Sequence, residues 1–69
     1  MTKIGGCYKT SCHYYMKRDE DVLHVNSGTP LINLLDVDFL DNYKLEIIEE
    51  VSELEFLTVL NDVMDKLNL

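Results

Sequence analysis

Residues 52–67 constrain the fold of this 69-residue chain more than any other segment, because they combine a helix start signal with a helical period. Ser52 suits a helix N-cap, and Glu55 three residues later completes a capping box, in which each side chain accepts a hydrogen bond from an otherwise unpaired backbone amide. At ~100° per residue, seven apolar side chains then share an arc of roughly 160°. They are Phe56, Leu57, Val59, Leu60, Val63, Met64 and Leu67. The sequence therefore predicts a C-terminal amphipathic helix, whose apolar stripe must pack on a surface supplied by residues 1–51.

Alternating apolar and polar residues predict that this surface is a sheet. Residues 7–16 and 22–26 alternate with a period of two, which is typical of half-buried strands. A charged turn between them permits an antiparallel register in which side chains of one kind face each other. The predicted pairs are Met16 with Leu23, Tyr14 with Val25 and Tyr15 with His24.

Residues 31–39 and 43–51 alternate in the same way and predict a second hairpin. A three-residue loop at 40–42 pairs Phe39 with Tyr43 and so keeps apolar residues opposite each other. The predicted fold is α+β, with residues 1–69 forming a single small domain. Its architecture is a four-stranded antiparallel β-meander with the C-terminal amphipathic helix packed on one face.

A short helix over residues 30–36, in place of part of the third strand, is the alternative. Thr29 would be its N-cap and Pro30 its first helical residue, which is a favoured position for proline. Short apolar runs do not distinguish a helix from a strand, so the pattern leaves both interpretations open.

Charge is distributed unevenly along the chain, whose formal net charge is −7. Residues 1–18 contain four basic side chains and no acidic one, which gives +4. Residues 19–69 contain all 13 acidic residues and two lysines, which gives −11. A strongly anionic majority repels nucleic acid and favours encounter with cationic partners.

The residues that most often carry chemistry do not form a catalytic or metal-binding pattern. Cys7, Cys12, His13 and His24 are suitable zinc ligands, but structural zinc sites use short spacings such as C-x2-C. In a regular strand Cys12 and His13 also point to opposite faces, which leaves the thiol without an activating base. Residues 5–10, GGCYKT, have tyrosine where a phosphate-binding loop needs glycine before the lysine. We expect no enzymatic activity, metal or cofactor, and two reduced cysteines.

A basic and aromatic set on the outer face of the first predicted hairpin gives one functional hypothesis. Aromatic rings among basic groups on an exposed sheet stack bases and bind phosphates. Few positive charges lie there on a strongly anionic molecule, so nucleic-acid binding is the alternative rather than the preferred function. Its candidate residues are Lys9, His13, Tyr15, Lys17 and Arg18.

The outer face of the second predicted hairpin gives the preferred hypothesis. The helix can cover only one face of the sheet, so aliphatic side chains rimmed by carboxylates would be exposed on the other, as in many protein interfaces. We expect a small acidic protein-binding module that inhibits or regulates its partner by occupying a basic surface, such as one that binds nucleic acid. The candidate contact residues are Asp36, Asp38, Glu46, Glu50, Leu34 and Ile48.

Self-association and location complete the expectations. A chain of this length buries only about 60% of its unfolded surface, so a homodimer formed through sheet faces or edges would add stability. Small acidic phage-encoded inhibitors and antitoxin-like proteins are similar in size and charge, a similarity that does not depend on fold. We find no run of ~20 apolar residues and no signal peptide, and we expect a soluble cytoplasmic protein without membrane contact.

Overall fold

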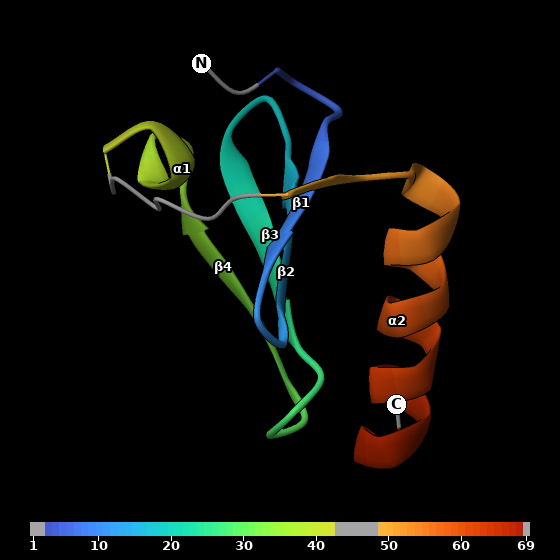
Figure 1. Ribbon diagram of the computed structural model, residues 1–69. Coiled ribbons are helices and arrows are strands. Elements are labelled where there is room, and N and C mark those ends of the chain that lie inside the picture. Colours follow the sequence, from blue (N-terminus) through green and yellow to red (C-terminus); the bar gives the residue numbers. More distant parts are fainter. Residues whose placement is uncertain (1–2, 43–48, 69) are drawn as a thin grey trace.

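The computed structural model describes residues 3–42 and 49–68 and has the predicted α+β class, an antiparallel sheet with the C-terminal helix packed on it (Figure 1). The sheet order is β4-β3-β2-β1-β5, and β1 to β4 form a meander. The strands are β1 (Cys7–Thr10), β2 (His13–Lys17), β3 (Asp21–Asn26), β4 (Leu31–Asp36) and β5 (Glu49–Val51). The helices are α1 (Phe39–Asn42) and α2 (Glu53–Leu67).

The first predicted strand is in fact a hairpin, which corrects the sequence interpretation. Its chain turns at Ser11 and Cys12, where Ser11 adopts a left-handed φ of 54°. The two turn residues shift the alternation, so the residues on one face are even-numbered in β1 and odd-numbered in β2. Tyr8 therefore pairs with Tyr15 and shares its face, not that of Tyr14. The Tyr14-Tyr15 doublet hides this change, because an aromatic residue fits the alternation on either side of the turn.

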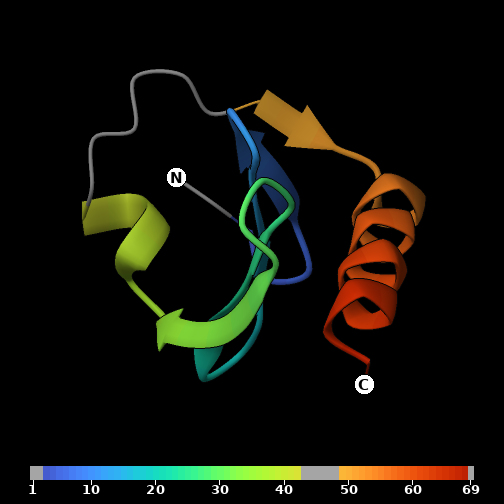
Figure 2. The same cartoon turned by 90° about the horizontal axis from the view of Figure 1, so that it is seen from below.

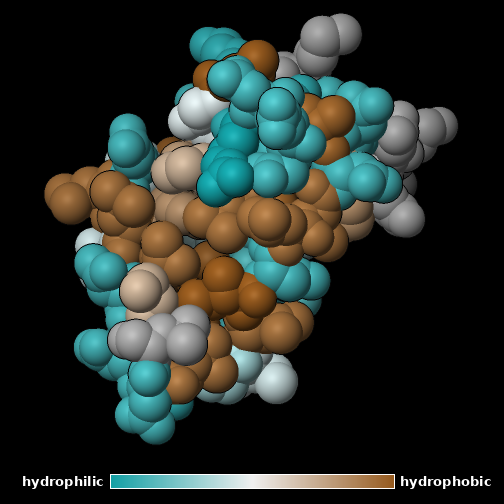
Figure 3. Space-filling view, turned by 180° about the vertical axis from the view of Figure 1, so that it is seen from behind, coloured by the Kyte–Doolittle hydropathy of each residue, from teal (hydrophilic) through white to brown (hydrophobic). Residues whose placement is uncertain are grey.

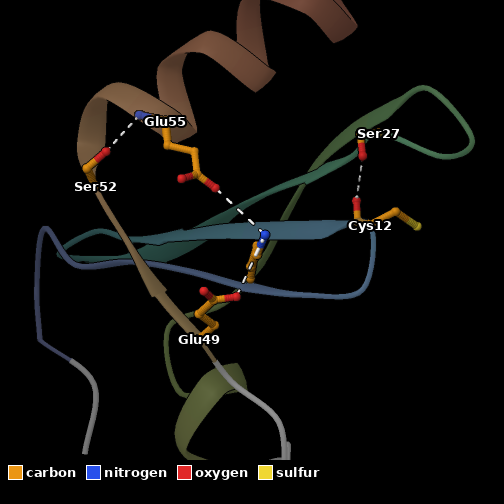
Figure 4. Close-up of polar contacts among 6 residues, drawn as sticks. Cys12, Ser27, Glu49, Ser52 and Glu55 are labelled. Atoms are coloured by element: carbon orange, nitrogen blue, oxygen red, sulfur yellow. Dashed lines mark hydrogen bonds and ion pairs between the residues drawn. The ribbon is translucent and has the colours of Figure 1, made fainter.

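The predicted register between the next two strands is confirmed. Tyr15 pairs with His24, and Met16 pairs with Leu23, in the antiparallel ladder of β2 and β3. Ser27 holds the far end of this ladder to the preceding turn, because its hydroxyl donates a hydrogen bond of 3.1 Å to the Cys12 carbonyl (Figure 4).

The predicted second hairpin is wrong. Residues 31–36 do form a strand, which also rules out a helix there, and this strand pairs with β3 as the predicted meander requires. The chain then turns at Val37 and Asp38 and enters α1, so no loop at residues 40–42 joins two paired strands. The fifth strand, β5, instead pairs with β1 at the opposite edge of the sheet. Residues 43–48, which include most of the predicted fourth strand, lie outside the described residues.

Helix α2 begins and ends as its sequence predicts. The Glu55 amide donates to the Ser52 hydroxyl at 3.0 Å, and the chain leaves the helix through Asn68 in a left-handed conformation. Phe56 and Val63 are fully buried against the sheet. The start of α2 is also held electrostatically, because Lys9 of β1 lies 3.9 Å from Glu55 and 3.7 Å from Glu49 (Figure 4).

Both faces of the sheet carry a hydrophobic cluster, so the expectation of one open face is wrong. Figure 2 shows α2 on one side of the sheet and α1 on the other. The α2 side is built on four buried residues, Cys7, Val25, Phe56 and Val63. The α1 side is built on Tyr8, Tyr15, Val22 and Leu40, with Leu35 and Phe39 packed against them. Leu40, which the predicted hairpin placed in its loop at residues 40–42, closes this second cluster.

Candidate functional site

The six predicted protein-contact residues do not lie on one surface. Leu34 and Asp36 belong to β4, and Asp38 follows it in the turn before α1. Glu50 belongs to β5, at the other edge of the five-stranded sheet. Glu46 and Ile48 lie outside the described residues. Of the four that the structure describes, three therefore lie together, along β4 and the turn that follows.

The basic and aromatic set is brought together only in part, and its charges are engaged within the chain. Lys9 points to the α2 side, where it contacts two glutamates. Lys17 is 8% exposed and lies 2.7 Å from the Asp41 carboxylate, while Arg18 forms an ion pair of 2.6 Å with Asp21. Tyr15 is buried and stacked on His24. A surface for phosphates and bases needs unpaired cations and open rings, which this set does not offer.

Two histidines form a hydrogen-bonded row on the α1 side of the sheet, which sequence reasoning had treated as an exposed patch. The row starts at His13 Nδ1, which lies 2.9 Å from His24 Nε2, and His24 Nδ1 lies 2.6 Å from Asn33 Oδ1. Because the Asn33 oxygen can only accept, His24 donates to it from Nδ1. The row therefore uses both ring nitrogens of His24 inside the protein.

Two side chains near these clusters have shifted proton affinities. Burial raises the pKa of the Cys7 thiol, and the negative charge of Glu53 raises it further. Burial likewise raises the pKa of the Tyr15 hydroxyl, with a smaller contribution from Cys12. Both groups thus favour their protonated, uncharged forms, and neither is activated as a nucleophile. Within residues 3–42 and 49–68, no three metal-binding side chains come together.

Several acidic residues belong to segments at one end of the sheet, the upper end in Figure 1. The β2–β3 turn and the end of β4 meet there, because Asp21 pairs directly with Asp36. We call Asp19, Glu20, Asp36 and Asp38 the acidic end; all four side chains are exposed. Sequence reasoning found only the last two, because it placed Asp19 and Glu20 in a charged turn and did not predict which residues of β4 lie beside that turn.

Asp36 faces another carboxylate across the ladder. Directly opposed like charges destabilise an antiparallel pair by a few tenths to about 1 kcal/mol. Arg18 offsets the charge of Asp21, which it contacts through two hydrogen-bonding nitrogens. Asp36 lies outside the ion pairs found among the described residues, so its charge remains available to a partner.

Comparison with known proteins gives no relative for this chain: no family model, curated protein or solved structure matches it. No helix in the described part of the chain has both the length and the apolar character needed to cross a membrane.

Proposed function

We propose that this protein is an acidic protein-binding module whose acidic end binds a basic surface on a partner protein. The observation that carries the proposal is the Asp21–Asp36 pair. A carboxylate placed opposite another carboxylate weakens the sheet, and residues that weaken a fold are most often explained by function.

The internal ion pairs support the same proposal. Four basic side chains contact carboxylates of their own chain, namely Lys9, Lys17, Arg18 and Lys66. Seven described acidic residues are exposed and lie outside these ion pairs. They are Asp19, Glu20, Asp36, Asp38, Glu50, Glu53 and Asp65. The surface offered to a partner is therefore mainly anionic, and it attracts cationic surfaces at long range.

The chemistry of this surface favours a regulatory role. A basic surface that binds nucleic acid recognises spaced negative charges, and the acidic end supplies these without a nucleic acid. Binding would then compete with nucleic acid, form quickly and weaken as salt increases. Two free cysteines are consistent with a reducing compartment such as the cytoplasm.

Charge reversal of the acidic end tests the proposal. The probe is a fluorescent poly-lysine peptide, titrated with the protein at low and high salt. In the double variant Asp36→Lys, Asp38→Lys we expect affinity to fall about tenfold or more, which corresponds to ~1.4 kcal/mol of binding free energy. Both side chains are exposed, so the variant should fold.

A matched control separates the acidic end from net charge. The double variant Asp62→Lys, Asp65→Lys changes the charge equally, but near the end of α2, at the lower end in Figure 1. We expect it to lose much less affinity than the Asp36, Asp38 variant. Equal losses in the two variants would show that only total charge matters and would reject the acidic end as the site.

A further inference from the structure

The two edges of the sheet differ in how they are protected. The edge strand β5 is three residues long and carries two adjacent glutamates, Glu49 and Glu50. The other edge strand, β4, is twice as long and is uncharged from residue 31 to residue 35. Charge and shortness are the usual devices that prevent an edge strand from pairing with another chain. One edge has both devices, whereas the β4 edge is longer and carries its single charge, Asp36, at its last residue.

Aliphatic side chains are exposed along the β4 edge. Leu34 is 57% exposed and Leu31 is 44% exposed, although they point to opposite faces of the sheet. Figure 3, which views the molecule from the side of β4, shows hydrophobic residues gathered over the sheet and α2. A strand that exposes apolar residues on both faces, next to an unprotected edge, is suited to β-strand addition.

We infer that the β4 edge pairs with the β4 edge of a second copy of this chain, antiparallel, about a two-fold axis at Asn33. This register places the uncharged segments of the two copies fully against each other. Ile32 lies opposite Leu34 of the second copy, and Leu31 lies opposite its Leu35. Each Asp36 then lies opposite Pro30, so the carboxylates stay apart.

Neighbouring registers fit less well. Paired residues of an antiparallel ladder share a face of the sheet, so the register of two β4 strands can change only by two residues at a time. Each such change moves the two-fold axis to a neighbouring residue. A two-fold axis at Leu34 places Asp36 opposite Ile32, and an axis at Ile32 places Leu34 opposite Pro30. The axis at Asn33 gives the greatest number of aliphatic pairs, and such pairs stabilise cross-strand association.

The position of α2 favours the same dimer. Ile32 and Leu34 lie on the α2 side of β4, because they pair with Val25 and Leu23 of the α2 cluster. A two-fold axis perpendicular to the sheet keeps both copies of α2 on one side of a continuous ten-stranded sheet. The exposed Leu34 side chains are then covered between the two helices, while the acidic ends lie at opposite ends of the dimer.

Electrostatic repulsion between two copies is smallest at the β4 edge, which favours this edge for self-association. Two chains that each carry a formal charge of −7 repel, so they approach best where neither presents a charge. Screening this repulsion with salt strengthens the dimer. Salt weakens the proposed binding to a basic partner, so salt changes the two associations in opposite directions. The two proposals can therefore be rejected independently.

Sedimentation velocity across a dilution series from millimolar to micromolar tests the inference. We expect the wild-type protein to reach twice the chain mass of 8.0 kDa, at lower concentrations when salt is added. The variant Leu34→Lys should dissociate about tenfold or more readily, because it places a charge in the strand pair. The matched control Leu54→Lys changes a leucine that is 76% exposed in the first turn of α2, away from β4, and should dimerise as the wild type does.

Cross-linking tests the register. In the variant Asn33→Cys the two new thiols face each other across the axis, and the Cβ atoms of directly paired residues lie ~4.5–5.5 Å apart. A small shift brings them to the ~3.5–4.5 Å of a disulfide, so mild oxidation should link the chains. The wild type, with Cys7 and Cys12, and the variant Leu54→Cys should remain uncross-linked. A wild type that stays monomeric throughout, a dimer unaffected by Leu34→Lys, or Asn33→Cys chains that do not link would each overturn the inference.

Discussion

His24 connects three strands through hydrogen bonds rather than through bulk. Its two ring nitrogens contact His13 on β2 and Asn33 on β4, and its ring stacks on Tyr15 with centroids 5.1 Å apart. We expect His24→Phe, which keeps a stacking ring but removes both hydrogen bonds, to lower the free energy of unfolding by about 1–3 kcal/mol. Urea unfolding measures this change.

A double-mutant cycle with His13→Phe separates the hydrogen bond from packing. Each single variant leaves one nitrogen of the remaining histidine without its partner, whereas the double variant removes both groups. We therefore expect the two effects to be non-additive, with a coupling of about 1 kcal/mol. Additive effects would mean that the 2.9 Å contact between the rings contributes nothing to stability.

The Cys7 thiol makes stability depend on pH in the alkaline range. Its pKa is raised above 9.0 by burial and by the charge of Glu53, so the folded protein favours the protonated thiol. The stabilising effect is complete below pH 9.0 and is lost as pH rises, because the unfolded thiol ionises first. Tyr15, with a pKa raised above 10.0 by burial, acts in the same direction at higher pH.

Unfolding at increasing pH tests this dependence. We expect the free energy of unfolding to fall as pH rises above 9.0, and to fall less steeply in Cys7→Ala, which lacks the thiol. The comparison of slopes removes the general effect of net charge, which both proteins share. Equal slopes for the two proteins would contradict the assignment to Cys7.

At the scale of single elements, the start of α2 depends on its cap. The Ser52 hydroxyl accepts a hydrogen bond from the Glu55 amide at 3.0 Å. We expect Ser52→Ala to destabilise the protein by ~1 kcal/mol, and Ser52→Asp to restore most of that loss, because aspartate also caps a helix. Thermal or urea unfolding of the wild type and both variants measures these changes in stability. Failure of aspartate to restore stability would show that the cap is not what Ser52 contributes.

The pairing of β3 with β4 should improve when its like charges are removed. We expect Asp36→Asn to raise the free energy of unfolding by about 0.2–1 kcal/mol, because it removes one carboxylate opposite Asp21. Asp38→Asn is the control, since Asp38 lies in the turn beyond the ladder and should change stability less. If Asp36→Asn is no more stable than the wild type, Asp36 carries no cost to the fold.

Local signals in the sequence were enough to predict some elements of the fold. The capping residue and the 3.6-residue period of α2 lie within one segment, and the structure has that helix from Glu53 to Leu67. The register of β2 with β3 also follows from neighbouring residues, because a short turn leaves few ways to match their faces. These predictions needed no knowledge of distant contacts.

The remaining elements depend on contacts between distant segments. The alternation of residues 31–36 predicts a strand, and the predicted meander pairs it with β3, but the same alternation also suggested residues 43–51 as its second partner, whereas Glu49–Val51 pair with β1. Leu40 was placed in the loop of that predicted hairpin, but it belongs to α1 and completes the second hydrophobic cluster. The acidic end was missed because local alternation does not give the register of β3 with β4, in which Asp21 lies opposite Asp36. The position of β5 likewise depends on its pairing with β1, which lies more than 35 residues earlier in the chain.

The whole molecule separates its charges from its apolar surface. Four basic side chains form internal ion pairs, four exposed acidic residues lie at one end of the sheet, and the uncharged stretch of β4 lies along one side. We propose that this arrangement supports two contacts of different kinds, a salt-sensitive contact with a basic partner and an apolar contact with a second copy of the chain. The proposal for the first contact rests on Asp36, which lies opposite a second carboxylate, Asp21, in its own sheet.

The most direct test is to measure stability and binding on the same single variant, Asp36→Lys. Lysine opposite Asp21 turns a repulsive pair into an attractive one, so the free energy of unfolding should rise, while affinity for the poly-lysine probe should fall. A more stable protein that binds more weakly is the predicted result. A protein that is more stable and binds the probe with unchanged affinity would contradict the proposal that the acidic end is a binding site.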